Sequence, residues 1–154
     1  MIRRLLASAL GAALLVPAAA IAQDGFAGQL AARQGQFDIL ALNIGVLGGM
    51  ARGNTPYDAA MAQQAADNIV AVSRIAQTFN WPEGSDNMSI EGTRALPAIW
   101  DNLDDVVAKW AALGTAAEGL AAVAGTGQEA LGPALGAVGG TCQACHEAYR
   151  APEN

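Results

Sequence analysis

The sequence predicts an all-α fold, an antiparallel up-down-up-down four-helix bundle, and three observations favour it. Four long segments carry apolar residues at spacings of three and four, which places those residues on one helix face. Hydrophobic residues make up 53% of the 154-residue chain but aromatic residues only 5%, so the core must consist mainly of alanine and aliphatic side chains. Such side chains suit helices in close contact, and mostly short connections make consecutive helices antiparallel neighbours.

The first two helices are predicted on either side of a short polar loop. The first extends from about residue 25 to residue 50, and its apolar face carries Phe26, Leu30, Phe37, Leu40, Ile44 and Leu47. The second is expected over about 56–79, because Thr55 can cap the free amides and Pro56 suits the first helical position. Its predicted inward residues are Ala62, Ala65, Ile69, Val72, Ala76 and Phe79.

The second half of the chain contains a long loop and two further helices. Residues 80–96 show no sustained period, and loops of this length often cover a site. The third helix is predicted over about 97–123, with one face formed by Ile99, Trp100, Leu103, Val107, Trp110 and Leu113. The fourth extends from about Gln128 to Arg150, and Pro133 either delays its start to about Gly132 or kinks it. We favour a kink or a short broken first turn.

The first 22 residues have the composition of a secretory signal peptide. Residues 1–4 are basic, residues 5–16 form an apolar run that is short for a membrane span, and Ala20-Ile21-Ala22 is a small-residue cleavage site. An uncleaved membrane anchor is the alternative, which Pro17 and the neighbouring alanines disfavour. We therefore expect cleavage after Ala22, a single mature domain of residues 23–154, and a location in the periplasm.

The charge of the mature domain excludes two classes of partner. Removal of residues 1–22 takes away two arginines and leaves 6 basic residues against 14 acidic ones, a net charge of −8. Nucleic acid needs a basic protein surface for its phosphates, and anionic membranes need the same. No nucleic acid and no stable membrane association are expected.

The strongest chemical signal lies close to the C-terminus, in the motif Cys142-Gln143-Ala144-Cys145-His146. Cys-x-x-Cys-His is the attachment signature of a c-type haem, in which both thiols add to haem vinyl groups and the imidazole reaches the iron. Cys142 and His146 share a helix face because they are four residues apart. The sequence therefore predicts one covalently bound haem c per chain, with His146 as the axial iron ligand and no disulfide.

Two other interpretations of the motif fit poorly. A thioredoxin-like Cys-x-x-Cys needs a βαβ setting, and nothing in the sequence alternates strand with helix. A structural zinc site needs four ligands, whereas the whole chain contains 2 cysteines and 1 histidine, all within this motif.

The residue types leave the sixth iron ligand open. Bis-histidine ligation within the chain is impossible, because His146 is the only histidine. A low-spin soluble electron carrier is the alternative function, with methionine as sixth ligand from Met50, Met61 or Met88. A lone methionine on a helical bundle is more often core filler than ligand. A peroxidase is disfavoured, because the chain has no distal histidine for acid–base work on peroxide.

Four stretches extend the pattern beyond the haem motif: residues 142–150, Arg33-Gln34-Gly35-Gln36-Phe37, Pro56-Tyr57-Asp58-Ala59 and Ala98-Ile99-Trp100. In them the sequence resembles cytochrome c′, the class II c-type cytochrome family, and the likeness extends from about Gly28 to Arg150. The resemblance implies a five-coordinate, high-spin haem whose distal face is closed by an apolar side chain. The residues that it places around the haem are Phe37 on the distal side, Arg33, Gln34, Thr93 and Arg94 near the propionates, and Arg150 on the proximal side.

The resemblance also implies that the protein binds small gases and is not a dedicated enzyme. Phe37 offers no hydrogen-bond donor, so NO and CO are the expected ligands, and a poor affinity for O₂ is expected. Protection from nitrosative stress, ferric–ferrous cycling with redox partner proteins, and a homodimer formed through the first two helices are further expectations.

Overall fold

The computed structural model describes residues 18–153, with side chains from Gly25 onward, and it confirms the predicted all-α bundle. Within these residues the regular structure consists of helices and one isolated antiparallel bridge between Ala95 and Arg150. The helices are α1 (Ala18–Ala51), α2 (Ala59–Ser73), α3 (Ala98–Asp101), α4 (Leu103–Ala121) and α5 (Gln128–Tyr149). The predicted signal peptide, residues 1–22, lies largely outside the described residues. No described helix combines the length and apolarity that a membrane crossing requires.

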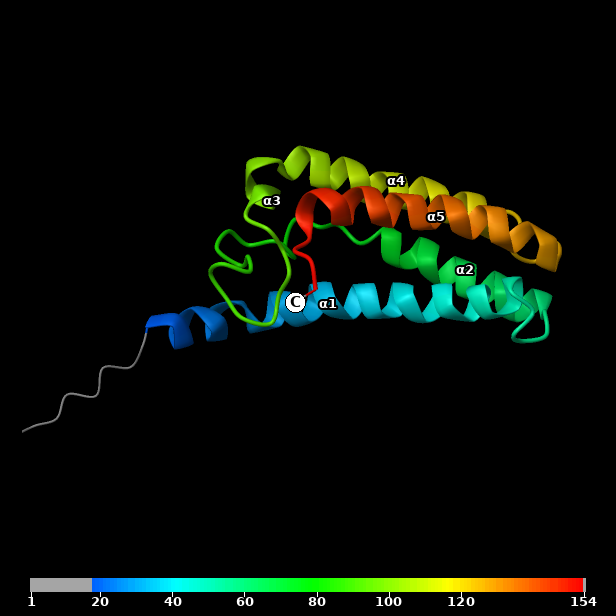
Figure 1. Cartoon of the computed structure of the whole chain (residues 1–154), viewed down its shortest axis with the longest axis horizontal. Helices are drawn as coiled ribbons and strands as arrows, with labels where there is room; N and C mark the ends of the chain where they lie inside the picture. The colour runs from blue at the N-terminus through cyan, green and yellow to red at the C-terminus, as the bar shows by residue number, and fades with distance from the viewer. Residues whose placement is uncertain (1–17, 154) are drawn as a thin grey trace, which may run out of the picture.

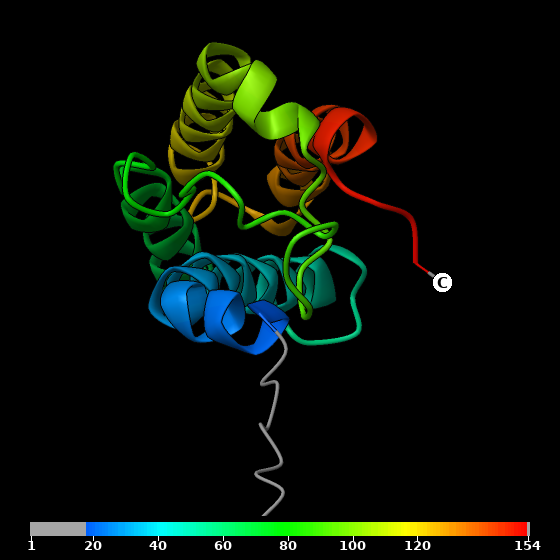
Figure 2. The same cartoon turned by 90° about the vertical axis from the view of Figure 1, so that its left-hand side faces the viewer.

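The four long helices form a square in which sequence neighbours run antiparallel. Figure 1 shows α1 and α4 running in one direction and α2 and α5 in the other, and Figure 2 shows the bundle nearly end-on. α1 packs against α2 and α5, and α4 packs against the same two helices. Within residues 18–153 no backbone packing joins α1 to α4. These two helices therefore face each other across a diagonal that only side chains can span.

The tightest packing lies where α1 leads into α2, which we name the closed end of the bundle. Side chains with no exposure there are Leu47, Met50, Ala62, Ala66, Leu120 and Leu131. The alanines let neighbouring helix backbones approach, and the larger side chains fill the remaining space. Full burial of each leucine contributes about 1.5–3 kcal/mol. The closed end is therefore stabilised by its own apolar side chains.

The N-terminus of α2 lies later than predicted. Asp58, not Thr55, caps the helix, because its carboxylate accepts a hydrogen bond of 2.8 Å from the Met61 N–H. Aspartate is a somewhat better N-cap residue than threonine. The helix begins at Ala59, so the placement of Pro56 in its first turn was wrong.

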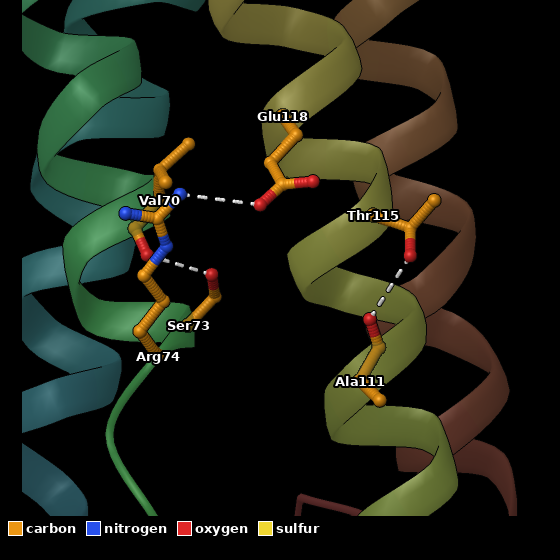
Figure 3. Close-up of polar contacts among 6 residues, drawn as sticks. All are labelled: Val70, Ser73, Arg74, Ala111, Thr115 and Glu118. Carbon is orange, nitrogen blue, oxygen red and sulfur yellow. Dashed lines mark hydrogen bonds and ion pairs between the residues drawn. The ribbon is translucent and has the colours of Figure 1, made fainter.

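α2 also ends earlier than predicted, at Ser73. The Ser73 hydroxyl donates to the Val70 carbonyl at 2.8 Å, and Arg74 pairs with Glu118 of α4 at 3.2 Å (Figure 3). A hydroxyl bonded in this way tends to bend a helix and weaken its continuation. The predicted inward residues that lie beyond this end, and are exposed instead, are Ala76 and Phe79.

The third predicted helix is broken at Asn102. The Asn102 backbone, at φ −139° and ψ 38°, leaves the helical region, and its side-chain amide donates to the Ala98 carbonyl at 3.0 Å. This break separates α3 from α4 and changes the face that α4 turns inward. Val106 is therefore buried, whereas Leu103 and Val107, both predicted to face inward, are 42% and 55% exposed.

α5 matches the bounds predicted for the fourth helix. It continues unbroken from Gln128 to Tyr149 through Pro133, so the helix does not begin near Gly132, and the broken first turn that we favoured is wrong. The proline is tolerated on the exposed side of the helix. The second half of α5 carries the Cys-x-x-Cys-His motif to the end of the bundle opposite the closed end.

At that opposite end, which we name the open end, loop 74–97 and tail 150–153 lie over the helices (Figure 1). The Leu96 N–H donates to the Tyr149 carbonyl at 3.0 Å, and the Ala151 N–H donates to the Arg94 carbonyl at 2.8 Å. The loop and the tail thus hold each other beside the haem motif.

Candidate functional site

All nine residues predicted for the site line one cavity at the open end. The cavity has a volume of about 490 Å³, within the range of small-molecule sites, and lies between α1, α4, α5 and loop 74–97. The predicted residues that line it are Arg33, Gln34, Phe37, Thr93, Arg94, Cys142, Cys145, His146 and Arg150. The fold thus brings together side chains that lie more than a hundred positions apart in the sequence.

The two cysteines are free thiols on the α5 wall of the cavity. Cys142 packs against the main hydrophobic core, and Cys145 packs against a second cluster that contains Ile99 and Tyr149. Burial is the largest influence on both thiols, and it raises the pKa of each above its usual value. Both sulfurs are therefore protonated at neutral pH.

His146 lies on the same wall, with its imidazole exposed toward the cavity mouth. Partial burial, together with the positive charges of Arg150 and Arg94, lowers the pKa of His146. The neutral imidazole is the form that binds metal, because only an unprotonated ring nitrogen has a free lone pair. The surroundings of His146 thus favour its ligating form.

Arg33 places a buried positive charge on the α1 wall. Its guanidinium donates to the Ser85 hydroxyl at 2.7 Å, to the Ser85 carbonyl at 2.6 Å and to the Thr93 hydroxyl at 2.8 Å. It also lies 4.8 Å from the centre of the Trp81 ring. Burial lowers the pKa of Arg33, and Asp86 partly opposes that shift, but no ion pair forms among the described residues. A buried cation with only neutral partners favours an anionic group nearby.

The other predicted polar residues are tied to the loop and the tail. Gln34 donates to the Gly92 carbonyl at 2.6 Å. Arg94 pairs with the Glu153 carboxylate at 2.5 Å, and Arg150 lies 4.0 Å from the same carboxylate. Two further guanidinium groups are thereby held at the border of the cavity.

Phe37 lies on α1 and turns its ring toward the cavity, where it is 37% exposed. Its ring meets that of Trp110 on α4 edge-on, with centroids 5.9 Å apart and planes at 82°. Aliphatic side chains of Leu40, Ile44 and Leu113 line the same region. This part of the wall is apolar, and a phenyl ring has no lone pair to offer a metal.

None of the three methionines predicted as alternative ligands lines the cavity. Met50 is fully buried in the core of the closed end. Met61 and Met88 are 53% and 80% exposed on the surface. Methionine ligation of an iron held by His146 is therefore disfavoured by the fold.

Several aromatic residues that line the cavity were not assigned to the site from the sequence. Trp81, Trp110 and Tyr149 belong to this group. The Tyr149 hydroxyl donates to the Asp105 carboxylate at 2.6 Å, and this bond, with burial and the nearby negative charges, raises the pKa of Tyr149 to about 12. The low aromatic content of the sequence could have pointed to these residues, because aromatic residues form only 5% of the chain and half of them line this cavity.

Comparison with known proteins shows the family to which the chain belongs. The sequence model of cytochrome c′ matches residues 28–150. A cytochrome c′ from Cereibacter sphaeroides is 40% identical over 148 residues, which cover 96% of this chain and 97% of that one. The chain belongs to the cytochrome c′ family. The structure of a cytochrome c′ from Rhodobacter spheriodes superposes with a TM-score of 0.77 at 38% identity, covering 81% of this chain and 96% of that one.

Other structures of cytochrome c′ show what relatives bind. One cytochrome c′ with ligand-controlled dimer dissociation gives a TM-score of 0.72 at 31% identity, covering 80% of this chain and 95% of that one. A ferrous variant from Alcaligenes xylosoxidans holds NO, with a TM-score of 0.68, 27% identity and coverage of 81% and 94%. A second variant from that organism holds CO, with a TM-score of 0.68, 28% identity and coverage of 80% and 94%.

As a cytochrome c′, the chain is a covalent haem c protein. Its cavity fits that group in two respects. The free thiols of Cys142 and Cys145 and the neutral imidazole of His146 are the donors that haem c attachment requires. The buried charge of Arg33 matches the anionic propionates that every haem c carries.

Proposed function

We propose that this cytochrome c′ is a periplasmic, high-spin haem c protein that binds NO and CO on a vacant distal side and protects against nitric oxide. The observation that carries the proposal is that Phe37 and His146 line one cavity, which none of the methionines in the described chain enters. When bound, the haem supplies an iron atom that cycles between ferric and ferrous states and accepts a neutral diatomic ligand.

The motif on α5 holds the cofactor from one wall. Cys142 and Cys145 would each hold the haem through one thioether. Cys142 packs against the main hydrophobic cluster and Cys145 against the second, so this turn of α5 is fixed against both. His146 presents its neutral ring nitrogen from the same face as Cys142. Attachment and ligation therefore depend on a single rigid turn of helix.

The charges at the open end orient the cofactor. Arg33, with its neighbours Gln34 and Thr93, binds propionate on the α1 side, because a charge-assisted bond compensates a buried cation better than neutral partners do. Arg94 adds positive charge from the loop, and Arg150 lies one turn beyond His146 on the proximal side. These residues bind and orient the cofactor, and the proposal gives them no part in chemistry.

Phe37 determines which ligands are accepted. Its ring excludes water and gives no hydrogen bond, so a ligand that depends on a distal donor, such as O₂ or an anion, gains nothing. NO and CO are neutral and bind ferrous iron without such help. The NO and CO held by two variants of a relative support the binding of these two gases.

Absorption spectra of the mature holoprotein in ferric, ferrous and NO-bound forms test the proposal. We expect a high-spin ferric spectrum, ready binding of NO and CO by the reduced protein, and weak binding of O₂. A low-spin ferric spectrum with a methionine-to-iron charge-transfer band would instead establish the electron-carrier function. The N-terminal sequence of the protein isolated from the periplasm tests cleavage after Ala22.

We also propose a homodimer formed through α1 and α2. Ile39 and Leu42 on α1 are 47% and 68% exposed, and Met61 on α2 is 53% exposed, so the outer faces of both helices carry apolar side chains that the core does not use. The relative with ligand-controlled dimer dissociation supports a comparable association. Sedimentation with and without CO should show a dimer that Leu42→Lys weakens. A monomer at all concentrations would exclude it.

A further inference from the structure

The rings of Phe37 and Trp110 meet across the bundle, from two helices whose backbones are not close neighbours. α1 and α4 lie on a diagonal of the bundle, and their backbones make no close contact within residues 18–153. Across this diagonal the two rings meet edge-on, with centroids 5.9 Å apart, and both rings line the cavity. The ring pair therefore couples the distal wall on α1 to α4.

The two rings differ in how firmly they are held. Trp110 packs against the main hydrophobic core, whereas Phe37 does not belong to that cluster and faces the cavity. A side chain packed in the core cannot change rotamer without moving its neighbours, whereas a side chain outside that cluster has fewer neighbours to displace. Trp110 is thus the fixed member of the pair, and Phe37 is the member that can move.

The indole N–H of Trp110 indicates that stability alone does not explain this residue. Trp110 Nε1 is buried and has no hydrogen-bond acceptor among the described residues. The Trp100 indole, by comparison, donates to the Trp81 carbonyl at 3.1 Å. A buried donor without a partner opposes folding, and a phenyl or aliphatic side chain at position 110 would avoid that cost. The contact with the Phe37 ring is the aromatic interaction that the structure gives this indole.

We propose that Trp110 is a positioning residue, which holds Phe37 over the distal side and thereby slows the approach of NO and CO to the iron. This inference rests on the proposed function, because it assigns the rate of ligand access to the contact between the two rings. A ligand must displace the Phe37 ring before it can reach the distal side. The edge-to-face attraction to Trp110 opposes that displacement.

CO association with the reduced holoprotein tests the proposal in wild type, Trp110→Leu, Phe37→Ala and the double variant. Trp110→Leu should bind CO about 2-fold to 10-fold faster, which corresponds to the strength of an aromatic pair. In the Phe37→Ala background, Trp110→Leu should cause no further acceleration, because Trp110 acts through Phe37. Trp100→Leu is the matched control, since Trp100 does not line the cavity, and it should bind CO at the wild-type rate.

Two results would overturn the inference: an unchanged rate in Trp110→Leu, or an equal acceleration with and without Phe37. If Trp110→Leu fails to fold, Trp110→Met refills much of the volume without a ring and carries the same expectation. A wild type that takes up no CO would defeat the proposed function. CO uptake that is equally fast in wild type and Trp110→Leu would defeat this inference alone.

Thermal unfolding of the holoprotein gives a second readout that is independent of ligand binding. Trp110→Phe and Trp100→Phe lose the same ring volume, but Trp110→Phe loses no formed hydrogen bond, so its Tm should fall less. Trp100→Phe removes a formed hydrogen bond, and its Tm should fall. An equal fall in both variants would show that the Trp110 N–H has a partner after all, and would remove this support.

Discussion

The two ends of the bundle are built differently. At the closed end, Leu47, Leu120 and Leu131 are fully buried, and alanines bring the helices into contact. At the open end a smaller hydrophobic cluster borders a cavity of about 490 Å³, and hydrogen bonds from side chains such as Arg33 connect α1 to loop 74–97.

This difference shows how one short chain can be stable and still keep a binding site for a large cofactor. The closed end is complete without a cofactor, because its own side chains exclude water. The open end contains a buried cation and two half-buried thiols that fit a large flat group, so binding of that group completes the core there. The following experiments test this contrast, from the largest expected effect to the smallest.

Removal of both thiols should have the largest effect on haem content and hydrogen exchange. The change in exchange should be confined to the open end. A Cys142→Ser/Cys145→Ser variant should carry no covalent haem, which mass spectrometry measures directly. Hydrogen exchange should speed up by at least about tenfold, or about 1.4 kcal/mol, in loop 74–97 and in residues 142–150. Exchange at the closed end should change much less, and a uniform loss along the chain would contradict the contrast.

A cavity at the closed end should weaken the whole fold without touching the haem. Leu131→Ala should lower the free energy of unfolding by about 2–5 kcal/mol, because the fully buried side chain leaves a void. The ferric absorption spectrum of the folded variant should match that of wild type. Leu103→Ala, at a side chain that is 42% exposed, is the matched control and should cost less than about 1 kcal/mol in unfolding experiments.

Alkaline pH should act on the open end through Tyr149. Its hydrogen bond to Asp105 raises the pKa of Tyr149 to about 12, above the value of about 10 for a free tyrosine. Folding therefore favours the neutral phenol, and this contribution is complete below about pH 10 and is lost as the pH rises toward 12. Tyr149→Phe should make the free energy of unfolding less dependent on pH between 10 and 12. Denaturant unfolding at several pH values measures this, and equal slopes in both proteins would be the contrary result.

The smallest effect is expected at an ion pair on the surface between the two ends. Arg74 and Glu118 are 3.2 Å apart, and their side chains are 68% and 61% exposed (Figure 3). Arg74→Ala should lower the free energy of unfolding by no more than about 1 kcal/mol, and less in high salt, because water screens the pair. A loss near that of Leu131→Ala would show that this contact matters more than its exposure indicates.

The contrast between the ends also explains which features the sequence could predict. Apolar periodicity identified the helices, and the Cys-x-x-Cys-His spacing identified the site on α5, because both are local patterns. The likeness to cytochrome c′ then pointed to Arg33 and Phe37 on α1, and the cavity contains both.

The helix boundaries that the sequence predicted wrongly depend on side chains that hydrogen-bond to the backbone. The early end of α2 at Ser73 and the break at Asn102 depend on individual hydrogen bonds, which an apolar period does not detect. The break at Asn102 explains why Val106, and not Val107, is buried. The pairing of Phe37 with Trp110 depends on two helices that are distant in sequence and whose backbones are not close neighbours, so no local pattern could reveal it.

The hydrogen bonds between loop 74–97 and residues 149–151 have a consequence for the mobility of the haem motif. The Leu96 N–H donates to the Tyr149 carbonyl and the Ala151 N–H donates to the Arg94 carbonyl, so the end of α5 is tied to the loop by two backbone bonds. Arg94 from the loop and Arg150 from the tail both line the cavity beside His146. A change that loosens the loop therefore also loosens the helix turn that carries the iron ligand.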